Sequence, residues 1–161
     1  MADLSEPRVI AVGGPTASGK TALSVALAKT FDGEIINADS MQLYKGLDIG
    51  TAKPSPEEQQ GIPHHLLDFL PPETAYSVAD FTAAADPLIR EISGRGRLPF
   101  VVGGTGLYIT SLLNGMSFAP EKTDPAIRAR LQAQADAGDG AALYARLQQI
   151  DPDYAALVHP N

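Results

Sequence analysis

The sequence predicts an α/β fold in which helices cover a parallel sheet, with a small helical insertion or appendage towards the C-terminus. An apolar, β-branched segment near the start meets a glycine-rich loop that leads into a helical pattern. Strand and helix patterns alternate from there to Pro120, and beyond it the sequence is rich in alanine with helical patterns alone. Alternation of this kind is typical of a parallel sheet with covering helices.

The first elements follow from local patterns. Arg8–Val12 is apolar and β-branched, and predicts a buried strand that ends at a pair of glycines. Lys20–Thr30 has Ala and Leu at helical spacing, and Gly33 ends this helix. Glu34–Asn37 predicts a second short strand. Residues 48–63 are rich in Gly, Pro and Glu and predict a mobile loop.

The next helix has a recognisable start. Ser77 and Asp80 resemble a capping box ahead of a long helical pattern. Pro87 lies inside this pattern, so we expect it to kink or divide the helix. Leu98–Val102 then predicts a strand that leads into a second glycine loop and another helix.

Three short helices are expected after Pro120. Each has a candidate N-cap residue, and a proline at the first helical position follows two of them. The candidate caps are Thr123 or Asp124 for the first helix, Asp139 for the second and Asp151 for the third.

The composition is that of an ordinary soluble globular protein, with 44% hydrophobic and 19% charged residues among 161. There is no cysteine, which excludes a disulfide framework, a thiolate metal site and a cysteine nucleophile. No apolar run approaches the roughly 18 residues of a membrane span, and the start lacks a signal-peptide pattern. We therefore expect a cytoplasmic protein without a membrane partner. The net charge of −7 disfavours a self-sufficient nucleic-acid binder, although a local basic patch remains compatible with it.

The first glycine loop matches the phosphate-binding motif G-x-x-x-x-G-K-[ST] between a strand and a helix, which makes the predicted fold P-loop NTPase-like. Inward-pointing N–H groups and the helix N-terminus hold an anion there. Lys20 supplies a charge to the phosphate oxygens, and Thr21 offers a hydroxyl to Mg²⁺. The predicted diphosphate- or nucleotide-binding residues are Gly14, Pro15, Thr16, Ala17, Ser18, Gly19, Lys20 and Thr21.

The motif does not identify the reaction. It suits a kinase, an NTPase, or an enzyme that expels diphosphate as a leaving group. A nucleotide kinase would normally add clustered arginines from a closing lid. Arg90, Arg95 and Arg97 are the arginines between Arg8 and Arg128, and their positions at a helix end and in a turn favour solvated residues.

Asp39 follows the second strand, where the carboxyl ends of parallel strands form the ligand-binding edge. It should therefore face the same crevice as the phosphate loop. Asp39 could bind Mg²⁺ through water or accept a proton from a nucleophile. It could equally cap the next turn together with Ser40.

Two other groups favour structural roles. His64 and His65 precede Asp68, but neighbouring side chains on extended backbone point in opposite directions, which disfavours a shared metal ion. A stripe of apolar residues in the last helix of the core favours helix packing over a pocket for an apolar substrate. Its members are Leu107, Tyr108, Leu112 and Leu113.

Five segments in order resemble the tRNA dimethylallyltransferases (the IPP transferase family). They are GPTASGKT, INADSMQLYKGLDIGTAKP, PHHLLDF, YSVADF and LPFVVGGTGLYI. The resemblance runs from about Val9 to Asn161. It implies transfer of the dimethylallyl group of dimethylallyl diphosphate to the exocyclic amine of an adenine beside the anticodon of tRNA. Diphosphate leaves, with Mg²⁺ as the cofactor.

The resemblance also implies residue roles. Asp39 matches the carboxylate that accepts the amine proton, and Thr16 lies in the family's substrate-contact stretch, which ends at Thr21. The catalytic set is thus Asp39, Lys20 and Thr21, with Thr21 towards the metal. The implied tRNA contacts are Asp39, Ser40, Met41, Gln42, Thr105 and Arg128.

Members of the family are nearly twice as long as this chain. We therefore expect 1–120 to be an incomplete P-loop α/β core whose further strands lie beyond the end of this chain. Residues 121–161 are expected to be a truncated helical insertion. The parent is expected to be a monomer. Two alternatives stay open from the residues: a small-molecule P-loop kinase, or an inactive fragment that binds diphosphate without chemistry.

Overall fold

The computed structural model describes residues 7–116 and 124–159. The chain divides into two compact units, Met1–Ser117 and Phe118–Asn161, which are considered separately. Thr123, one of the two candidate caps of the first C-terminal helix, lies outside the described residues.

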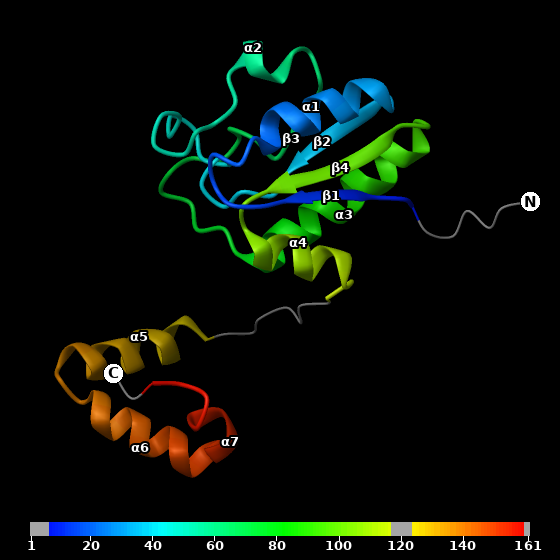
Figure 1. Ribbon diagram of the computed structural model, residues 1–161. Coiled ribbons are helices and arrows are strands. Elements are labelled where there is room, and N and C mark those ends of the chain that lie inside the picture. Colours follow the sequence, from blue (N-terminus) through cyan, green and yellow to red (C-terminus); the bar gives the residue numbers. More distant parts are fainter. Residues whose placement is uncertain (1–6, 117–123, 160–161) are drawn as a thin grey trace, which may run out of the picture. The chain divides into compact units, whose positions relative to one another are not determined.

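The first unit contains a parallel four-stranded sheet. The sequence predicts a parallel sheet and three of its strands, whereas the strand at His64–His65 was not predicted. The spatial order β1-β4-β2-β3 brings the first and last strands of the unit together and leaves β1 and β3 at the edges. Because all strands run the same way, their carboxyl ends meet at one edge of the sheet (Figure 1). The strands are β1 (Ile10–Gly13), β2 (Gly33–Asn37), β3 (His64–His65) and β4 (Leu98–Gly103).

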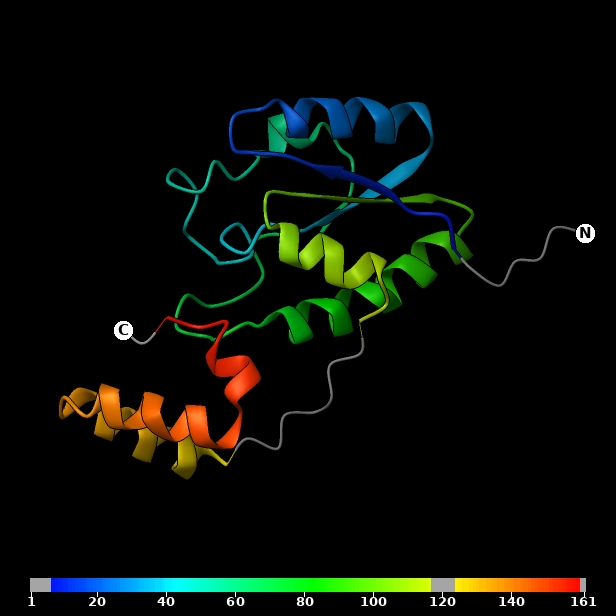
Figure 2. The same ribbon diagram turned by 60° about the horizontal axis from the view of Figure 1, so that its bottom comes forward.

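Helices cover both faces of this sheet. In the two views, α1 lies on one side of the strands, and α3 and α4 lie on the other (Figures 1 and 2). No helix within 7–116 or 124–159 is long and apolar enough to span a membrane. The helices of this unit are α1 (Lys20–Thr30), α2 (Pro56–Gln59), α3 (Val78–Gly94) and α4 (Gly106–Leu113).

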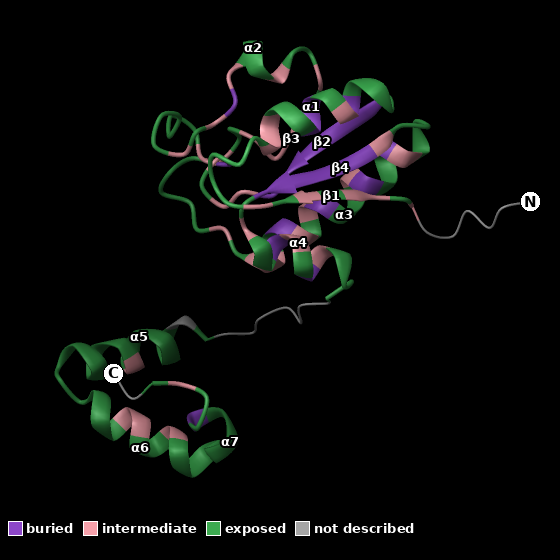
Figure 3. Cartoon of the chain, in the orientation of Figure 1, coloured by how far each residue is buried: buried purple, intermediate pink, exposed green. Residues whose placement is uncertain are grey.

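The core consists of two apolar clusters, one on each face of the sheet, because successive strand residues point to opposite faces. Ile35 and Phe100 pack under α1, whereas the next residues, Ile36 and Val101, pack under α3 and α4. Both central strands are buried along most of their length (Figure 3). Buried central strands between two helical layers are what a doubly covered parallel sheet requires.

Two local predictions are corrected. Of the two outcomes expected at Pro87, a kink or a division, the division does not occur, because α3 continues from Val78 to Gly94. The lost hydrogen bond is offset because α3 buries a continuous stripe against the sheet, and each buried large side chain contributes about 1.5–3 kcal/mol. The segment 48–63 is not a loop throughout, since α2 forms inside it with a capping box between Ser55 and Glu58. The capping box at the start of α3 is present as predicted.

The apolar stripe of α4 is only partly core. Tyr108 is buried and stacks on Phe81 of α3 with ring centroids 4.5 Å apart, and Leu112 packs on the same cluster. Leu107 and Leu113 are exposed, so the prediction that they pack in the core is wrong for the part of the chain described. An eight-residue helix on a sheet buries one face, and these two leucines lie off that face.

The second unit is helical in its described residues, 124–159. Its helices are α5 (Pro125–Asp136), α6 (Gly140–Ile150) and α7 (Pro152–Ala155). Asp124 and Asp151 cap α5 and α7, each accepting a hydrogen bond from a backbone N–H of the first turn. Asp139 occupies the N-cap position of α6 without such a bond from its side chain.

A buried glutamate in β2 binds side chains from β3 and from the turn before β4. Glu34 of β2 is 4% exposed and accepts hydrogen bonds from His65 Nε2 at 2.6 Å, Arg95 Nη2 at 2.8 Å and Arg97 Nη1 at 3.1 Å. Burial by itself raises the pKa of Glu34, but these hydrogen bonds, from His65 first, outweigh it and lower the pKa. Arg95 and Arg97 are therefore not merely solvated turn residues, as the sequence suggested, because they hold a buried carboxylate.

Replacing this carboxylate tests its contribution. A lowered pKa in the folded state means stability that is present above the ordinary pKa of 4.5 and lost as the pH falls below it. We expect Glu34→Gln to lower the free energy of unfolding at pH 7 by about 1–3 kcal/mol, with a difference that shrinks towards about pH 3. Urea unfolding at several pH values measures both effects.

The control is Asp86→Asn, which breaks the exposed pair with Arg90 in α3 and should leave unfolding nearly unchanged. A Glu34→Gln protein as stable as the unchanged one at pH 7 would contradict this account.

Candidate functional site

The glycine loop between β1 and α1 has the shape of an anion site. Ala17 and Gly19 have left-handed backbone angles, with φ of 63° and 83°. Gly19 is the N-cap of α1 and makes no side-chain capping bond, so N–H groups of the first helical turn remain available to a ligand. A turn of this kind at a helix N-terminus concentrates N–H groups and the positive end of the helix dipole on one point.

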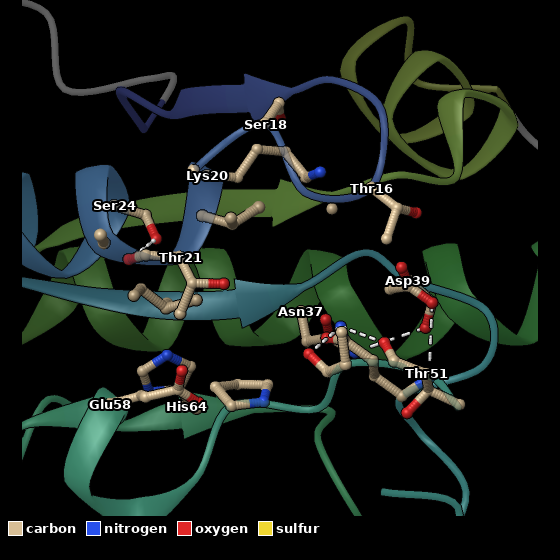
Figure 4. Close-up of a pocket in the computed structure, with 18 of the residues that line it drawn as sticks. Thr16, Ser18, Lys20, Thr21, Ser24, Asn37, Asp39, Thr51, Glu58 and His64 are labelled. Atoms are coloured by element: carbon tan, nitrogen blue, oxygen red, sulfur yellow. Dashed lines mark hydrogen bonds between the residues drawn. The ribbon is translucent and has the colours of Figure 1, made fainter. Parts of the chain in front are cut away.

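Lys20 and Thr21 lie at the mouth of this loop. Lys20 Nζ donates a hydrogen bond to the carbonyl oxygen of Pro15 at 2.6 Å, so its ammonium lies over the loop backbone. Figure 4 shows Thr21 below Lys20, and both residues line the cavity under the loop. Ser24, one turn later, donates to the Thr21 carbonyl oxygen at 3.0 Å and fixes the first turn of α1.

An inner cavity of about 410 Å³ lies beneath the loop. Its wall combines the loop, the ends of β2 and β4, and the segment between β2 and β3. Thr16 and Asp39 lie towards one end of it, and Glu58 and His64 lie towards the other (Figure 4). The polar residues that line it are Thr16, Ser18, Lys20, Thr21, Ser24, Asn37, Asp39, Gln42, Thr51, Glu58, Gln60 and His64.

Asp39 is placed by the close approach of two strand ends. Ala38, directly after β2, donates a backbone hydrogen bond to Val102 at 2.8 Å and accepts one from Thr105 at 3.2 Å. A Cβ atom on Gly103 would lie 2.1 Å from the Ala38 oxygen, so only glycine fits there. The prediction that Asp39 faces the same crevice as the phosphate loop therefore agrees with the geometry.

The carboxylate of Asp39 also caps a turn. Its Oδ1 atom accepts hydrogen bonds from the backbone N–H groups of Met41 at 3.0 Å and Gln42 at 3.4 Å. Its Oδ2 atom faces Gly104, 3.5 Å from where a Cβ would stand. One oxygen thus fixes the side chain while the other points towards the second glycine loop, so capping and a chemical role are compatible.

A second, outer cavity of about 960 Å³ adjoins the first. Asp39, Thr16 and Thr51 line both cavities, and Asp39 is the carboxylate among them. Thr105 Oγ1 accepts a hydrogen bond from the Ser40 N–H at 2.9 Å, which ties the two loops that bound the outer cavity. The residues that line only the outer cavity are Pro15, Ser40, Met41, Gly46, Leu47, Asp48, Ile49, Gly50, Gly104 and Thr105.

The loop after Tyr44 is held by a buried lysine that the sequence did not single out. Lys53 is 6% exposed, and its Nζ donates to Asp48, Asp68 and the Tyr44 carbonyl oxygen, each at 2.6 Å. Burial lowers the pKa of Lys53, but the hydrogen bonds to Asp48 and Asp68 outweigh it and raise the pKa. Lys53 lies in a segment rich in glycine and proline, and this segment has no periodic pattern that would have predicted a buried lysine.

His64 forms part of the wall of the inner cavity. Its Nδ1 lies 2.8 Å from the Ile62 carbonyl oxygen, and burial lowers the pKa of the ring. His65 turns the other way to Glu34, as expected for adjacent strand residues. Within 7–116 and 124–159 no cluster of three or more His, Asp or Glu could hold a metal ion.

The structure brings most of the predicted site residues together. Residues Thr16–Thr21 line the inner cavity, and Asp39–Gln42 and Thr105 line one cavity or both. Gly14 lines neither, but its position is close-packed, with Ser18 Oγ 3.3 Å from where a Cβ would stand. Arg128 lies in α5 of the second unit. Sequence reasoning missed Asn37, Thr51, Glu58, Gln60 and His64 as wall residues.

Comparison with known proteins identifies the relatives of this chain. A family model described as IPP transferase matches residues 42–161. The tRNA dimethylallyltransferase of Anaeromyxobacter sp. (strain K) is 53% identical over 154 residues, which are 96% of this chain and 50% of that protein. That of Bacillus subtilis (strain 168) is 49% identical over 161 residues, and the match covers 51% of it.

The chain belongs to the IPP transferase family. It spans about half the length of the curated relatives it matches. The phosphate loop precedes the segment matched by the family model, but the match to the Bacillus subtilis protein covers 100% of this chain and so includes the loop.

Solved structures of relatives share the fold. The full-length tRNA isopentenylpyrophosphate transferase of Bacillus halodurans is 49% identical, with a TM-score of 0.70 over 97% of this chain and 52% of its own. A eukaryotic dimethylallyltransferase captured acting on tRNA is 35% identical, with a TM-score of 0.83 over 97% of this chain and 39% of its own. The P-loop NTPase-like fold predicted from the sequence is thereby confirmed.

The strand-end contact beside Asp39 can be tested with two neighbouring glycines. A methyl group on Gly103 would overlap the Ala38 carbonyl, whereas on Gly104 the nearest atoms are 3.5 and 3.6 Å away, an ordinary contact distance. We expect Gly103→Ala to reduce the free energy of unfolding by about 1–3 kcal/mol, and Gly104→Ala to leave it nearly unchanged. Urea unfolding of both variants checks this, and equal stability of the two would refute it.

Proposed function

We propose that the protein carrying this chain is a tRNA dimethylallyltransferase. It transfers the dimethylallyl group of dimethylallyl diphosphate to the exocyclic amine of an adenine next to the anticodon of tRNA, and it releases diphosphate. The homologues named tRNA dimethylallyltransferase support this assignment. The observation that carries it within the molecule is the position of Asp39, which lines both the phosphate cavity and the outer cavity.

The phosphate loop suits a leaving group. An allylic carbon–oxygen bond breaks readily when the departing negative charge is stabilised. The open N-terminus of α1 and the Lys20 ammonium, which both border the inner cavity, would stabilise this charge. No arginine lines either cavity in the described part of the chain, which argues against a kinase with an arginine lid.

Asp39 suits the other half of the reaction. The adenine amine is a weak nucleophile, so removal of its proton as the new carbon–nitrogen bond forms lowers the barrier. A base in the outer cavity would present its amine to the inner cavity across Asp39. The Oδ2 atom of Asp39 then takes the proton, while the bonds from Met41 and Gln42 to Oδ1 keep the carboxylate in place.

A magnesium ion fits the residues of the inner cavity. Mg²⁺ prefers oxygen ligands and is usually held by one or two protein groups together with substrate phosphates and water. The Thr21 hydroxyl offers one such group beside the phosphate loop, and Asp39 lines the same cavity. When bound, the ion would neutralise part of the diphosphate charge.

The tRNA contacts divide between the two units. Asp39, Ser40, Met41 and Thr105 line the outer cavity, where the target adenine is proposed to bind. Gln42 uses its side-chain nitrogen to hold the carbonyl oxygens of Thr51 and Ala52, at 3.0 and 3.1 Å, so its contribution is to shape the cavity wall. Arg128 on α5 is proposed to contact the RNA backbone.

Lys20→Ala tests the leaving-group site. We expect the affinity for dimethylallyl diphosphate to fall by about 1.5–3 kcal/mol, the range for a charge-assisted hydrogen bond. Calorimetry with this chain and Mg²⁺ measures it, and Arg90→Ala on α3 serves as a control with the same change of charge. Unchanged affinity in Lys20→Ala would contradict the site.

Asp39→Asn tests the proton acceptor, because asparagine keeps an oxygen for the turn and removes the base. We expect kcat to fall by about 10²–10⁴, with the affinity for dimethylallyl diphosphate unchanged. The measurement is prenylation of an anticodon stem-loop RNA by a form of the protein that has the full length of its relatives. Near-normal turnover would mean that Asp39 serves only as a turn cap.

A further inference from the structure

Three apolar side chains stand exposed at the rim of the outer cavity. Met41 is 49% exposed, Leu47 is 38% exposed and Ile49 is 98% exposed. All three line the same cavity as Asp39. Exposed apolar residues are common when scattered, but three at the mouth of one cavity form a local apolar patch. We call these three residues the apolar rim.

The exposure of Ile49 is not the result of a loose segment. The Ala52 N–H donates to the Ile49 carbonyl oxygen at 3.2 Å, and the Lys53 N–H donates to Asp48 at 3.1 Å. The buried Lys53 ammonium ties the same loop to Asp68, and the Gln42 side chain holds its far side. In Figure 1 this loop, between β2 and α2, curls away from the edge of the sheet. The fold thus holds Ile49 out into solvent.

The proposed reaction requires an apolar contact at this place. The amine of a stacked adenine can reach Asp39 only if the base leaves the stack, which costs a few kcal/mol. Its departure exposes the face of the neighbouring base. Proteins that disrupt base stacks frequently place an apolar side chain such as Ile, Leu or Met against the exposed face. The apolar rim contains all three of these residue types.

The size of the patch favours a base over a protein partner. A stable protein interface covers about 800 Å² on each side, far more than three side chains provide. A single base face is of the size that one loop tip covers. The rim also lies beside Thr16 and Thr105, whose polar side chains suit the sugar and phosphate of a nucleotide.

We infer that Ile49 is a wedge residue, which packs against the base exposed when the target adenine enters the outer cavity, with Leu47 and Met41 supporting it. This inference rests on the proposed function. It assigns to Ile49 a positioning role in RNA binding, and it assigns no step of the chemistry to it.

The test uses two anticodon stem-loop RNAs and a form of the protein that has the full length of its relatives. One RNA carries the target adenine, and the other has an abasic site in its place. Ile49→Ala, Ile49→Leu and Phe31→Ala are compared by fluorescence anisotropy. Phe31, at the end of α1, is also exposed but lines neither cavity, so its variant controls for loss of surface apolar area.

We expect Ile49→Ala to weaken binding of both RNAs by about tenfold, because the gap in the stack is present in both. Ile49→Leu should restore most of the affinity, and Phe31→Ala should bind as the unchanged protein does. The affinity of Ile49→Ala for dimethylallyl diphosphate should be unchanged.

Two results would overturn the wedge role: Ile49→Ala binding the abasic RNA as tightly as the unchanged protein, or Phe31→Ala losing as much as Ile49→Ala. The proposed function fails separately, if the unchanged protein neither binds the RNA nor prenylates it. Unchanged prenylation and binding by Ile49→Ala would reject the wedge alone and leave the proposed function in place.

Discussion

The site depends on the contact between the ends of β2 and β4. The backbone of Ala38 bonds to Val102 and Thr105, and the space that a side chain would need at Gly103 is filled by the Ala38 carbonyl. This contact brings the turn that begins at Asp39 against the second glycine loop. The first glycine loop, after β1, borders the same edge because β1 pairs with β4 in register. Any shift at this contact would move Asp39 relative to the phosphate loop.

Two buried charged side chains stabilise different parts of the first unit, one in the sheet and one in a loop beside the outer cavity. Glu34 joins His65, Arg95 and Arg97 near the starts of β2 and β4, away from the cavities. Lys53 joins Asp48, Asp68 and the Tyr44 carbonyl near the outer cavity. A buried charge is costly unless several partners satisfy it, and each of these has three. The first arrangement holds the sheet, and the second holds the loop that shapes the outer cavity.

In the proposed reaction, the two cavities would hold the two halves of a group transfer. The inner cavity has the charge and N–H groups that an expelled diphosphate needs, and the outer cavity has space for a larger acceptor. A carboxylate at their junction touches both. An enzyme that transferred phosphate would need its acceptor beside the terminal phosphate, together with cations to close over it. Arg95 and Arg97 are engaged by Glu34 and line neither cavity.

The sequence by itself determined the features that are encoded over a few neighbouring residues. Helix α1 has the predicted bounds, the phosphate loop lies between β1 and α1, and the Ser77 cap begins α3. Spacing, capping and glycine content act within one or two turns of chain, so a local pattern is sufficient evidence for them. The resemblance carried by five ordered segments added the family, which the comparisons confirm.

Tertiary structure decided what depends on residues far apart in the chain. Glu34 meets arginines 61 and 63 positions away, and Thr105 meets Ser40 across 65. Packing against the sheet kept α3 whole across Pro87 and left Leu107 and Leu113 in solvent. The junction of two cavities at Asp39 exists only once three strand ends share an edge. Such contacts leave no periodic pattern in the sequence. Their partners are brought together by the fold of the whole unit, and not by the conformational preference of any short segment.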